Sequence, residues 1–215
     1  TDDGLVVTAR HVAIAASQRD ETLLRATDST GKVYTASLLS DDAESDLALI
    51  RLSGQETFPA AIRIGNSDLL ELGEDVLAIG NPFGRTSTVT RGIISSTRRT
   101  IVVRHDGGTV RTYTNLLQTD AAINPGSSGG ALVTLDGALL GICNAGMPEA
   151  DNLSFAIPSA TVSHILSERL IETASRLGLW FGCDFQESSG TIVACRIIPG
   201  GPFSRAGVVD GARIV

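Results

Sequence analysis

Several features that define common protein classes are scarce in this chain. Its three cysteines do not make up a complete disulfide framework, and no pair has the C-x-x-C spacing typical of a metal site. No apolar run approaches the ~18 residues of a membrane-spanning helix. The formal net charge of −7 provides no basic patch for nucleic acid or an anionic membrane. We therefore predict no metal, no cofactor, no transmembrane segment and no nucleic-acid partner.

Aromatic residues are also few, at 4% of the sequence, whereas glycine occurs 23 times. Glycine allows tight turns, and turn signals such as Asn81-Pro82-Phe83-Gly84 recur along the chain. This composition favours a mostly β protein with many short strands. With 215 residues, the chain can form one large domain or two smaller ones.

Only three histidines are present. His11 follows the β-rich run 5–9, so we expect it at the end of a strand and the start of a turn, facing a cleft. His105 lies beside a Gly-Gly turn and is expected to be solvated, and His164 lies in a helical pattern and is expected at the surface or in packing. A single histidine more often has a structural role than a catalytic one. His11 therefore needs partners before it can be called a catalytic base.

A serine framed by glycines is the first such partner. Residues 124–132 read Asn-Pro-Gly-Ser-Ser-Gly-Gly-Ala-Leu. A serine hydroxyl is a poor nucleophile unless a base removes its proton and N–H groups stabilise the oxyanion. Flanking glycines let the backbone turn tightly, direct two N–H groups at one point and leave room for a substrate carbonyl. The segment therefore predicts an acyl-transfer nucleophile.

The acid predicted to complete this group is Asp46. It opens a strand of alternating pattern, 47–52, where a carboxylate can be partly buried beside an imidazole and hold its tautomer. The neighbouring Asp41, Asp42 and Glu44 are interpreted as a solvated acidic loop. The order histidine, aspartate, serine is that of the chymotrypsin class.

The serine segment also fits the G-x-S-x-G nucleophile elbow of α/β-hydrolases, in which the chain order is serine, acid, histidine. His164 could supply that order, with Asp136 or Asp151 as the acid. An elbow requires a helix after the serine. Residues 131–142 instead read as two short apolar runs joined by Asp136-Gly137, a strong hairpin signal. The pattern therefore favours His11, Asp46 and Ser128.

Three motifs together resemble the catalytic blocks of the HtrA/Deg serine proteases. They are Val-Thr-Ala-Arg-His-Val at 7–12, Ser-Asp-Leu-Ala-Leu at 45–49 and the glycine-framed segment at 124–132. The stretches 64–68, 73–84, 89–95 and 152–158 are similar to the family in the same order. The resemblance implies a chymotrypsin-like double β-barrel over residues 1–172, with the family's first strands and its trimerisation segment lying before Thr1.

Carried over to this sequence, the resemblance assigns His11 as general base, Asp46 as the acid that orients it and Ser128 as nucleophile, because the family's nucleophile directly precedes Gly-Gly. Ser127 then stands where these proteases usually carry asparagine. The backbone N–H groups of Gly126 and Ser128 are expected to form the oxyanion hole.

The resemblance also implies a substrate pocket and its preference. The expected walls are Ile123, Asn144, Ala145 and Gly146. Family members usually carry a larger apolar residue at the position of Gly146, so the pocket here could be wider. No acidic residue directly precedes the serine segment as in enzymes that cleave after lysine or arginine. We therefore expect cleavage after aliphatic residues.

The chain changes character after the predicted barrel. Residues 159–177 have apolar residues at helical spacing, with Ser159 as the expected N-cap and Gly178 suited to the position after the helix. This linking helix is expected to pack its apolar face on the barrel. Residues 173–215 are interpreted as a linker and the first part of a PDZ domain.

The expected carboxylate-binding loop of that partial PDZ domain comprises Trp180, Phe181, Gly182 and Cys183. An amphipathic hairpin packed on the protease is the alternative interpretation of this region. The sequence ends before the helix that walls a PDZ groove. Cys183 and Cys195 flank a predicted hairpin turn and could approach each other across it, whereas Cys143 is expected to be a small buried residue.

The resemblance implies an ATP-independent serine endopeptidase of protein quality control. Its expected partners are unfolded or misfolded proteins and peptides, and a homotrimer is implied for the full-length protein. The expected location is outside the cytoplasm, in a bacterial periplasm or cell envelope. The alternative is a peptide-binding or chaperone-like relative with a largely inactive catalytic loop, and an inert structural fragment is a third interpretation.

Overall fold

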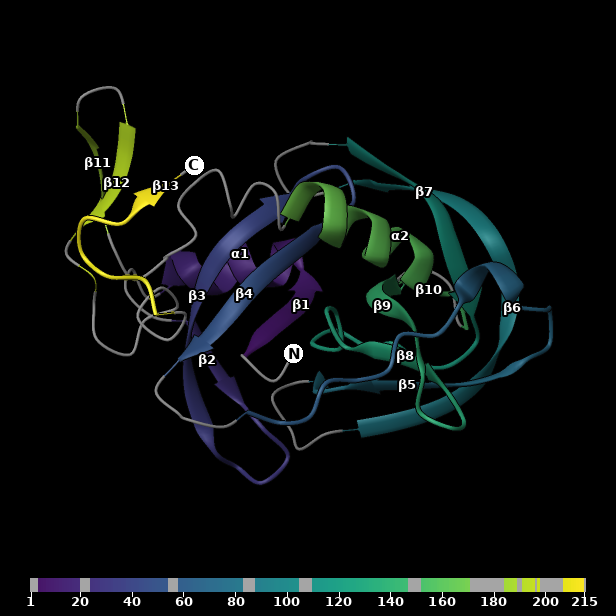
Figure 1. The fold of residues 1–215 in the computed structure, drawn as a ribbon. Coiled ribbons are helices and arrows are strands. Elements are labelled where there is room, and N and C mark those ends of the chain that lie inside the picture. Colours follow the sequence, from purple (N-terminus) through teal and green to yellow (C-terminus); the bar gives the residue numbers. More distant parts are fainter. Residues whose placement is uncertain are drawn as a thin grey trace. The chain divides into compact units, whose positions relative to one another are not determined.

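Strands predominate in the computed structural model of the chain, which describes residues 4–19, 24–53, 58–82, 88–104, 110–146, 152–170, 184–188, 191–195, 197 and 207–214. The chain divides into two compact units, Thr1–Ile171 and Glu172–Val215 (Figure 1). The first unit holds both an open sheet and a closed barrel. The mostly β architecture predicted from composition is confirmed.

The first sheet of this unit is four-stranded and antiparallel, in the order β1-β4-β3-β2. Ala9 at the end of β1 pairs with Leu47 at the start of β4. The residues that follow β1 and precede β4 are thereby brought to the same end of the sheet. The sheet's elements, with the helix that follows β1, are β1 Leu5–Ala9, α1 Arg10–Arg19, β2 Leu24–Thr27, β3 Val33–Asp42 and β4 Leu47–Ser53.

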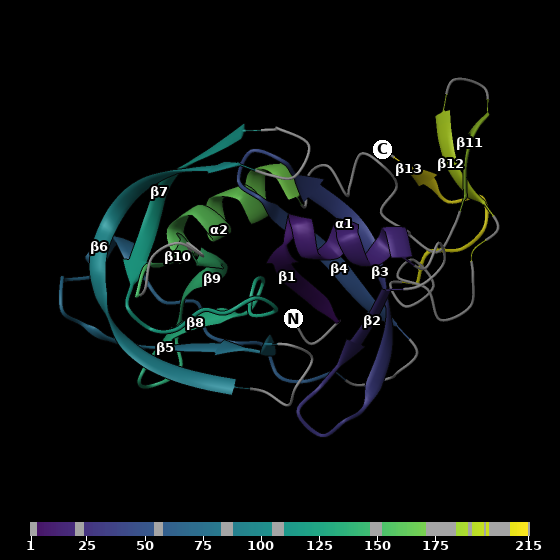
Figure 2. The same ribbon diagram turned by 180° about the vertical axis from the view of Figure 1, so that it is seen from behind.

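The second sheet closes into a barrel in the order β10-β7-β6-β5-β8-β9. Figures 1 and 2 show this barrel beside the first sheet, the arrangement expected of a chymotrypsin-like double β-barrel. The short 3-10 helix η1, Ser67–Leu69, precedes it. Its strands are β5 Asp75–Gly80, β6 Thr88–Arg104, β7 Val110–Thr119, β8 Ala131–Thr134, β9 Leu139–Gly146 and β10 Ser154–Pro158.

The hairpin predicted at Asp136-Gly137 is confirmed. β8 and β9 pair antiparallel, the Thr134 N–H donates to the Ala138 carbonyl at 2.9 Å, and Gly137 has a φ of 83°. Glycine adopts this left-handed conformation without steric cost. Because a strand and not a helix follows the serine segment, the nucleophile-elbow alternative is excluded.

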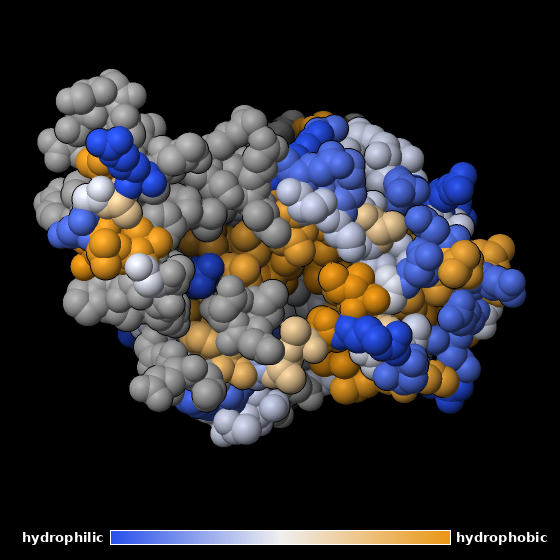
Figure 3. All heavy atoms as spheres, in the orientation of Figure 1, coloured by the Kyte–Doolittle hydropathy of each residue, from blue (hydrophilic) through white to orange (hydrophobic). Residues whose placement is uncertain are grey.

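The main hydrophobic core joins the two sheets. Leu47 and Leu49 of β4 are buried together with Tyr113 and Leu116 of β7 and Phe155 of β10. Figure 3 shows apolar side chains in the middle of the first unit and a mixture of hydrophilic and apolar ones along its outer edge over β6 and β7. Burial of this apolar surface makes the main favourable contribution to the free energy of packing β4 against the barrel. It therefore also positions Asp46, the residue before β4.

The predicted linking helix forms, but it starts differently. α2 spans Ser159–Ile165 and continues as the π-helix η3, Leu166–Leu170. Pro158 is the N-cap, so the assignment of Ser159 as N-cap is wrong. The Ser159 hydroxyl instead donates to the Gly65 carbonyl at 2.9 Å and accepts from the Ser67 N–H at 3.1 Å. These contacts attach the start of the helix to the segment before the barrel.

The apolar face of α2 and η3 is buried as predicted, through Val162, Ile165 and Leu170. His164 is exposed and lies 3.4 Å from Glu168 one turn later, which agrees with its interpretation as a surface residue. Gly178 and the remainder of the predicted helix after residue 170 lie outside the described residues.

The second unit contains a three-stranded antiparallel sheet in the order β11-β12-β13. Ser188 pairs with Thr191, so the hairpin predicted here forms. Trp180, Phe181, Gly182 and Cys183 lie outside the described residues, as does His105. The carboxylate-binding loop and the pairing of Cys183 with Cys195 therefore stay predictions. The strands are β11 Asp184–Ser188, β12 Thr191–Cys195 and β13 Arg213–Ile214.

Across the described ranges of both units, none of the helices has the length and apolar character needed to cross a membrane. Within the same ranges, no group of three or more histidine, cysteine or acidic side chains is arranged to hold a metal ion.

Candidate active site

His11 and Asp46 meet where β1 ends and β4 begins. The His11 Nδ1 atom lies 2.6 Å from Asp46 Oδ2, and the His11 backbone N–H donates to Asp46 Oδ1 at 3.0 Å. The Asp46 carboxylate is fully buried, whereas the His11 side chain is 43% exposed. A buried carboxylate that accepts from Nδ1 holds the imidazole in the tautomer whose Nε2 can accept a proton.

Local backbone structure places both side chains. α1 begins at Arg10, so His11 lies in the first turn of a helix and not in the turn predicted from the sequence. The Arg10 N–H donates to the Asp46 carbonyl at 2.7 Å. Asp46 has a φ of 58°, a left-handed conformation that is uncommon outside glycine, asparagine and aspartate. The backbone and the side chain of Asp46 therefore both contact the start of α1.

Asn144, at the end of β9, connects the acid with the serine. Its side-chain Nδ2 donates to Asp46 Oδ2 at 3.0 Å, and its backbone carbonyl accepts from Ser128 Oγ at 2.8 Å. Asn144 is 3% exposed. The family resemblance predicts Asn144 in a wall of the substrate pocket, whereas its side chain contacts the carboxylate of Asp46. The contact with Asp46 could have been predicted from the sequence, because Asn144 is an amide that directly follows the apolar residues Leu139–Cys143.

The acidic residues before Asp46 are predicted to be solvated, and they also form ion pairs. Arg10 Nε forms an ion pair with Asp41. Asp42, whose side chain is only 13% exposed, and Glu44 both pair with Arg169. The solvated interpretation therefore holds for Asp41 and Glu44, which are exposed, and is wrong for Asp42, which Arg169 holds in a partly buried position.

The loop that carries Ser128 is attached to β9. The Gly129 N–H donates to the Cys143 carbonyl at 2.7 Å, and the Cys143 N–H donates to the Gly130 carbonyl at 2.8 Å. Within the loop, the Ser127 N–H donates to the Asn124 carbonyl at 2.9 Å. Among the described residues, no hydrogen bond joins Ser128 Oγ to His11, because this hydroxyl donates to Asn144.

The backbone N–H groups of Gly126 and Ser128, the residues expected to form the oxyanion hole, have no backbone acceptor in the part of the chain that the structure describes. Gly126 has a φ of 95°, a conformation that L side chains rarely adopt. The loop can therefore donate two hydrogen bonds to an external group without breaking a backbone hydrogen bond.

Glycines bring the serine loop against the neighbouring strands. A side chain at Gly129 would overlap Thr8 Oγ1 of β1, three residues before His11. A Cβ atom at Gly80 of β5 would lie 2.6 Å from the Cβ atom of Ser127. The absence of side chains at these positions thus allows the loop to lie directly beside both β1 and β5.

We expect Gly129→Ala to lower kcat by about 10²-fold, because the overlap with Thr8 displaces Ser128, and a misplacement of about 1 Å can have this effect. Gly137→Ala is the matched control, since Gly137 has a φ of 83° against 81° for Gly129 but has nothing within 4 Å of an added Cβ. Both variants bear the backbone strain, about 1 kcal/mol. Only Gly129→Ala should lose activity. Adding Thr8→Ala to the Gly129→Ala protein should restore part of the activity, because it removes the overlapping Thr8 Oγ1 atom. Peptidase rates and thermal unfolding of all three variants test this, and equal losses in both glycine variants would contradict it.

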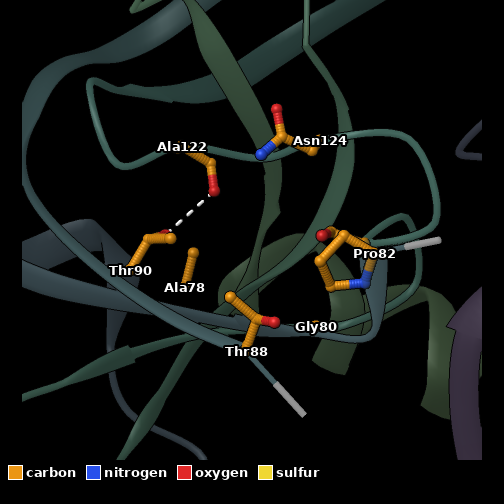
Figure 4. Close-up of a pocket in the computed structure, with 8 residues that line it drawn as sticks. Ala78, Gly80, Pro82, Thr88, Thr90, Ala122 and Asn124 are labelled. Atoms are coloured by element: carbon orange, nitrogen blue, oxygen red, sulfur yellow. Dashed lines mark hydrogen bonds between the residues drawn. The ribbon is translucent and has the colours of Figure 1, made fainter. Parts of the chain in front are cut away.

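A pocket borders the segment that leads to the nucleophile loop (Figure 4). Thr90 Oγ1 donates to the Ala122 carbonyl at 2.9 Å on one side of it. The pocket is uncharged along its described lining, which consists of Ala78, Gly80, Pro82, Thr88, Thr90, Ala122, Asn124 and Ser127.

Ile123 and Asn144, two of the residues predicted to wall the substrate pocket, do not line this space. Ile123 is buried, and its N–H donates to Ser154 Oγ at 3.2 Å. Ala145 and Gly146 form the end of β9, where they pair with Phe155 and Ser154 of β10. The predicted pocket walls therefore lie around the junction of β9 and β10.

Comparison with known proteins gives consistent matches. The model of the trypsin-like peptidase domain matches residues 1–142. Serine protease Do-like HtrB of Bacillus subtilis (strain 168) is 41% identical over 174 residues, which cover 79% of this chain and 36% of HtrB. Periplasmic serine endoprotease DegP of Escherichia coli (strain K12) is 41% identical over 170 residues, which cover 78% of this chain and 33% of DegP.

Among solved structures, the HtrA-type protease AlgW with decapeptide matches with a TM-score of 0.66 and 31% sequence identity. The match covers 98% of this chain and 65% of the AlgW chain. The chain thus spans about a third of the length of HtrB and DegP.

Proposed function

Because the chain belongs to the trypsin-like peptidase family and, within it, to the HtrA/Deg serine proteases, we propose that it carries the catalytic machinery of a serine endopeptidase. The observation that supports this proposal is the contact of His11 with the buried Asp46, joined through Asn144 to the hydroxyl of Ser128. These contacts link three groups that are far apart in sequence and that have the residue types of a Ser-His-Asp triad.

In the proposed mechanism, Ser128 attacks the peptide carbonyl while His11 Nε2 accepts the hydroxyl proton. Asp46 keeps Nδ1 protonated and stabilises the imidazolium that forms, and His11 then gives the proton to the leaving amine. The Ser128 hydroxyl has to turn from the Asn144 carbonyl toward His11 before the attack.

The backbone N–H groups of Gly126 and Ser128 are proposed to bind the oxyanion of the tetrahedral intermediate. Their lack of backbone acceptors within the described residues supports this role. Removal of one such donor typically lowers kcat by about 10²–10³-fold. We further propose a preference for aliphatic residues at the cleavage site, because the predicted pocket walls, Ile123, Ala145 and Gly146, carry no charge.

The proposed substrates are unfolded or damaged proteins and their peptides, cleaved without ATP outside the cytoplasm. Two properties of the relatives support this. The DegP relatives are named periplasmic serine endoproteases, and AlgW was solved with a decapeptide. A homotrimer is proposed for the full-length protein on the basis of the family resemblance.

A second candidate function is a peptide-binding or chaperone-like role with a largely inactive catalytic loop. The hydrogen bond from Ser128 Oγ to the Asn144 carbonyl favours it, because a hydroxyl held there is not poised on His11. A serine endopeptidase requires a Ser128 that reacts with an electrophile resembling the acyl group. The peptide-binding role predicts a Ser128 that does not react.

Labelling of the full-length protein with a fluorophosphonate probe distinguishes these functions. We expect the label on Ser128, located by peptide mapping, because only a hydroxyl with a working base reacts at a useful rate. A folded protein that does not take up the label would support the second candidate. A label on Ser127 would overturn the assignment of the nucleophile.

A further inference from the structure

The turn that carries Asp46 is itself held by an internal carboxylate. β3 ends at Asp42 and β4 begins at Leu47, so Asp46 is the last residue of a four-residue connection. Asp42 Oδ2 accepts hydrogen bonds from the Ser45 N–H at 2.8 Å and from Ser45 Oγ at 2.6 Å. Because Ser45 directly precedes Asp46, the position of the Asp42 side chain determines where the peptide leading into Asp46 lies.

The second oxygen of Asp42 is held from another element. Arg169 Nη1, on η3, donates to Asp42 Oδ1 at 2.9 Å and to Glu44 Oε2 at 3.0 Å. Burial raises the pKa of Asp42, but the hydrogen bonds from Ser45 and the contacts of Arg169 outweigh it and hold the pKa below its usual range. Asp42 is therefore ionised at neutral pH and pairs with the guanidinium.

The end of η3 is fixed on β3 by a further contact. Ser40 Oγ, which is buried, donates to the Leu170 carbonyl at 2.8 Å. The Leu170 side chain is 1% exposed and belongs to the main core. The backbone next to Arg169 is therefore fixed on β3 and the core. The guanidinium of Arg169 reaches the turn from this fixed point.

Two more arginines touch the same turn from other elements. Arg10, beside His11, pairs with Asp41, and Arg111 of β7 donates to the Ala43 carbonyl at 3.4 Å. Arg169 differs from them because one of its nitrogens contacts two carboxylates, on both sides of Ala43. It is therefore best placed to determine the shape of the turn.

We propose that Arg169 is a positioning residue that, by holding Asp42 and Glu44, fixes the turn from which Asp46 orients His11. The proposal rests on the peptidase function proposed above and adds to it a residue outside the three-residue catalytic group. An exposed ion pair by itself contributes little to stability. The contribution of Arg169 is therefore expected in the catalytic rate more than in the free energy of unfolding.

The first test compares steady-state kinetics of the full-length protein and its variants on a peptide substrate. Arg169→Ala is expected to lower kcat about fivefold with KM unchanged. Arg169→Lys should retain most of kcat, because an ammonium can still reach one carboxylate. Arg91→Ala is the matched control, since Arg91 pairs with Asp75 at 2.9 Å on the barrel surface and should leave kcat unchanged. A normal kcat in Arg169→Ala would overturn the proposal.

The second test asks whether Arg169 acts through the two carboxylates. In a background that carries Asp42→Asn and Glu44→Gln, Arg169→Ala should cause no further loss of kcat, because its partners are already neutral. A further fivefold loss in that background would overturn the proposal, since Arg169 would then act through another group.

The third test does not depend on catalysis. In the Ser128→Ala protein, hydrogen exchange measures the amides of Ser45 and His11, which donate to Asp42 and Asp46 respectively. Arg169→Ala should speed exchange in these two peptides and leave that of β5 unchanged. Uniformly faster exchange, or none, would overturn the positioning role. An inactive wild-type protein would refute the proposed function. The exchange rates of the Ser45 and His11 amides would still show whether Arg169 holds the turn.

Discussion

Ser128→Ala is expected to abolish casein cleavage by the full-length protein, with a fall in kcat of about 10⁶-fold. The variant removes the hydroxyl proposed as the nucleophile, which donates to the Asn144 carbonyl, and alanine offers no atom for attack on a peptide carbonyl. Within the described residues, the Ser128 side chain makes one hydrogen bond, to the Asn144 carbonyl. Initial rates on casein and on a fluorogenic peptide, together with a thermal melt that shows intact folding, measure the effect.

Ser127→Ala is the control for that experiment. Ser127 is buried, and its Cβ atom, which alanine retains, is the atom that approaches Gly80. We expect this variant to keep kcat within about tenfold of the wild-type value, because the loop conformation depends on the backbone of Ser127. If activity instead survived Ser128→Ala and disappeared in Ser127→Ala, the nucleophile would be Ser127.

Asp46→Asn is expected to lower kcat by about 10⁴-fold while the fold stays intact. The carboxylate of Asp46 accepts from three donors: the His11 backbone N–H, His11 Nδ1 and Asn144 Nδ2. An amide has only one acceptor oxygen, so its NH₂ group must face at least one of these donors. If the NH₂ group faces Nδ1, the imidazole takes the tautomer with a proton on Nε2 and cannot act as the base.

Rates at pH 7 on a peptide substrate measure this effect, and Asp41→Asn serves as its control. Asp41 lies in the same acidic segment and pairs with Arg10, but it is exposed and has no contact with the imidazole. We expect at most a severalfold loss in the control. A loss of less than tenfold in Asp46→Asn would show that His11 is oriented by another group.

Local signals in the sequence predicted much of this structure. The Asp136-Gly137 turn and the strand after Asp46 depend on neighbouring residues, and both form, although Leu47, Ala48 and Leu49 are buried in succession and not alternately. The helix α1 was missed, although its alanine-rich segment 13–16 has high helix propensity. The apolar run at 5–9 indicates a strand, and a turn was expected to follow it at His11.

Contacts between distant residues could not be read in the same way. The approach of His11 to Asp46 depends on the register of β1 and β4, which the motifs alone do not specify. Arg169 lies 127 residues from Asp42, and no local pattern connects them. Ser159 has the residue type of an N-cap, but its tertiary partners Gly65 and Ser67 take its hydroxyl.

The attachment of the serine loop to β9 gives the protein an internal reporter of unfolding. The thiol of Cys143 is fully buried, and burial raises its pKa to about 12. The thiolate is the form that reacts with alkylating reagents. Cys143 is therefore not modified while its strand is in place, because its thiol is then buried and protonated. The same residue binds the serine loop through its backbone N–H and carbonyl. Alkylation of Cys143 therefore records the moments at which the barrel opens and the nucleophile loses its support.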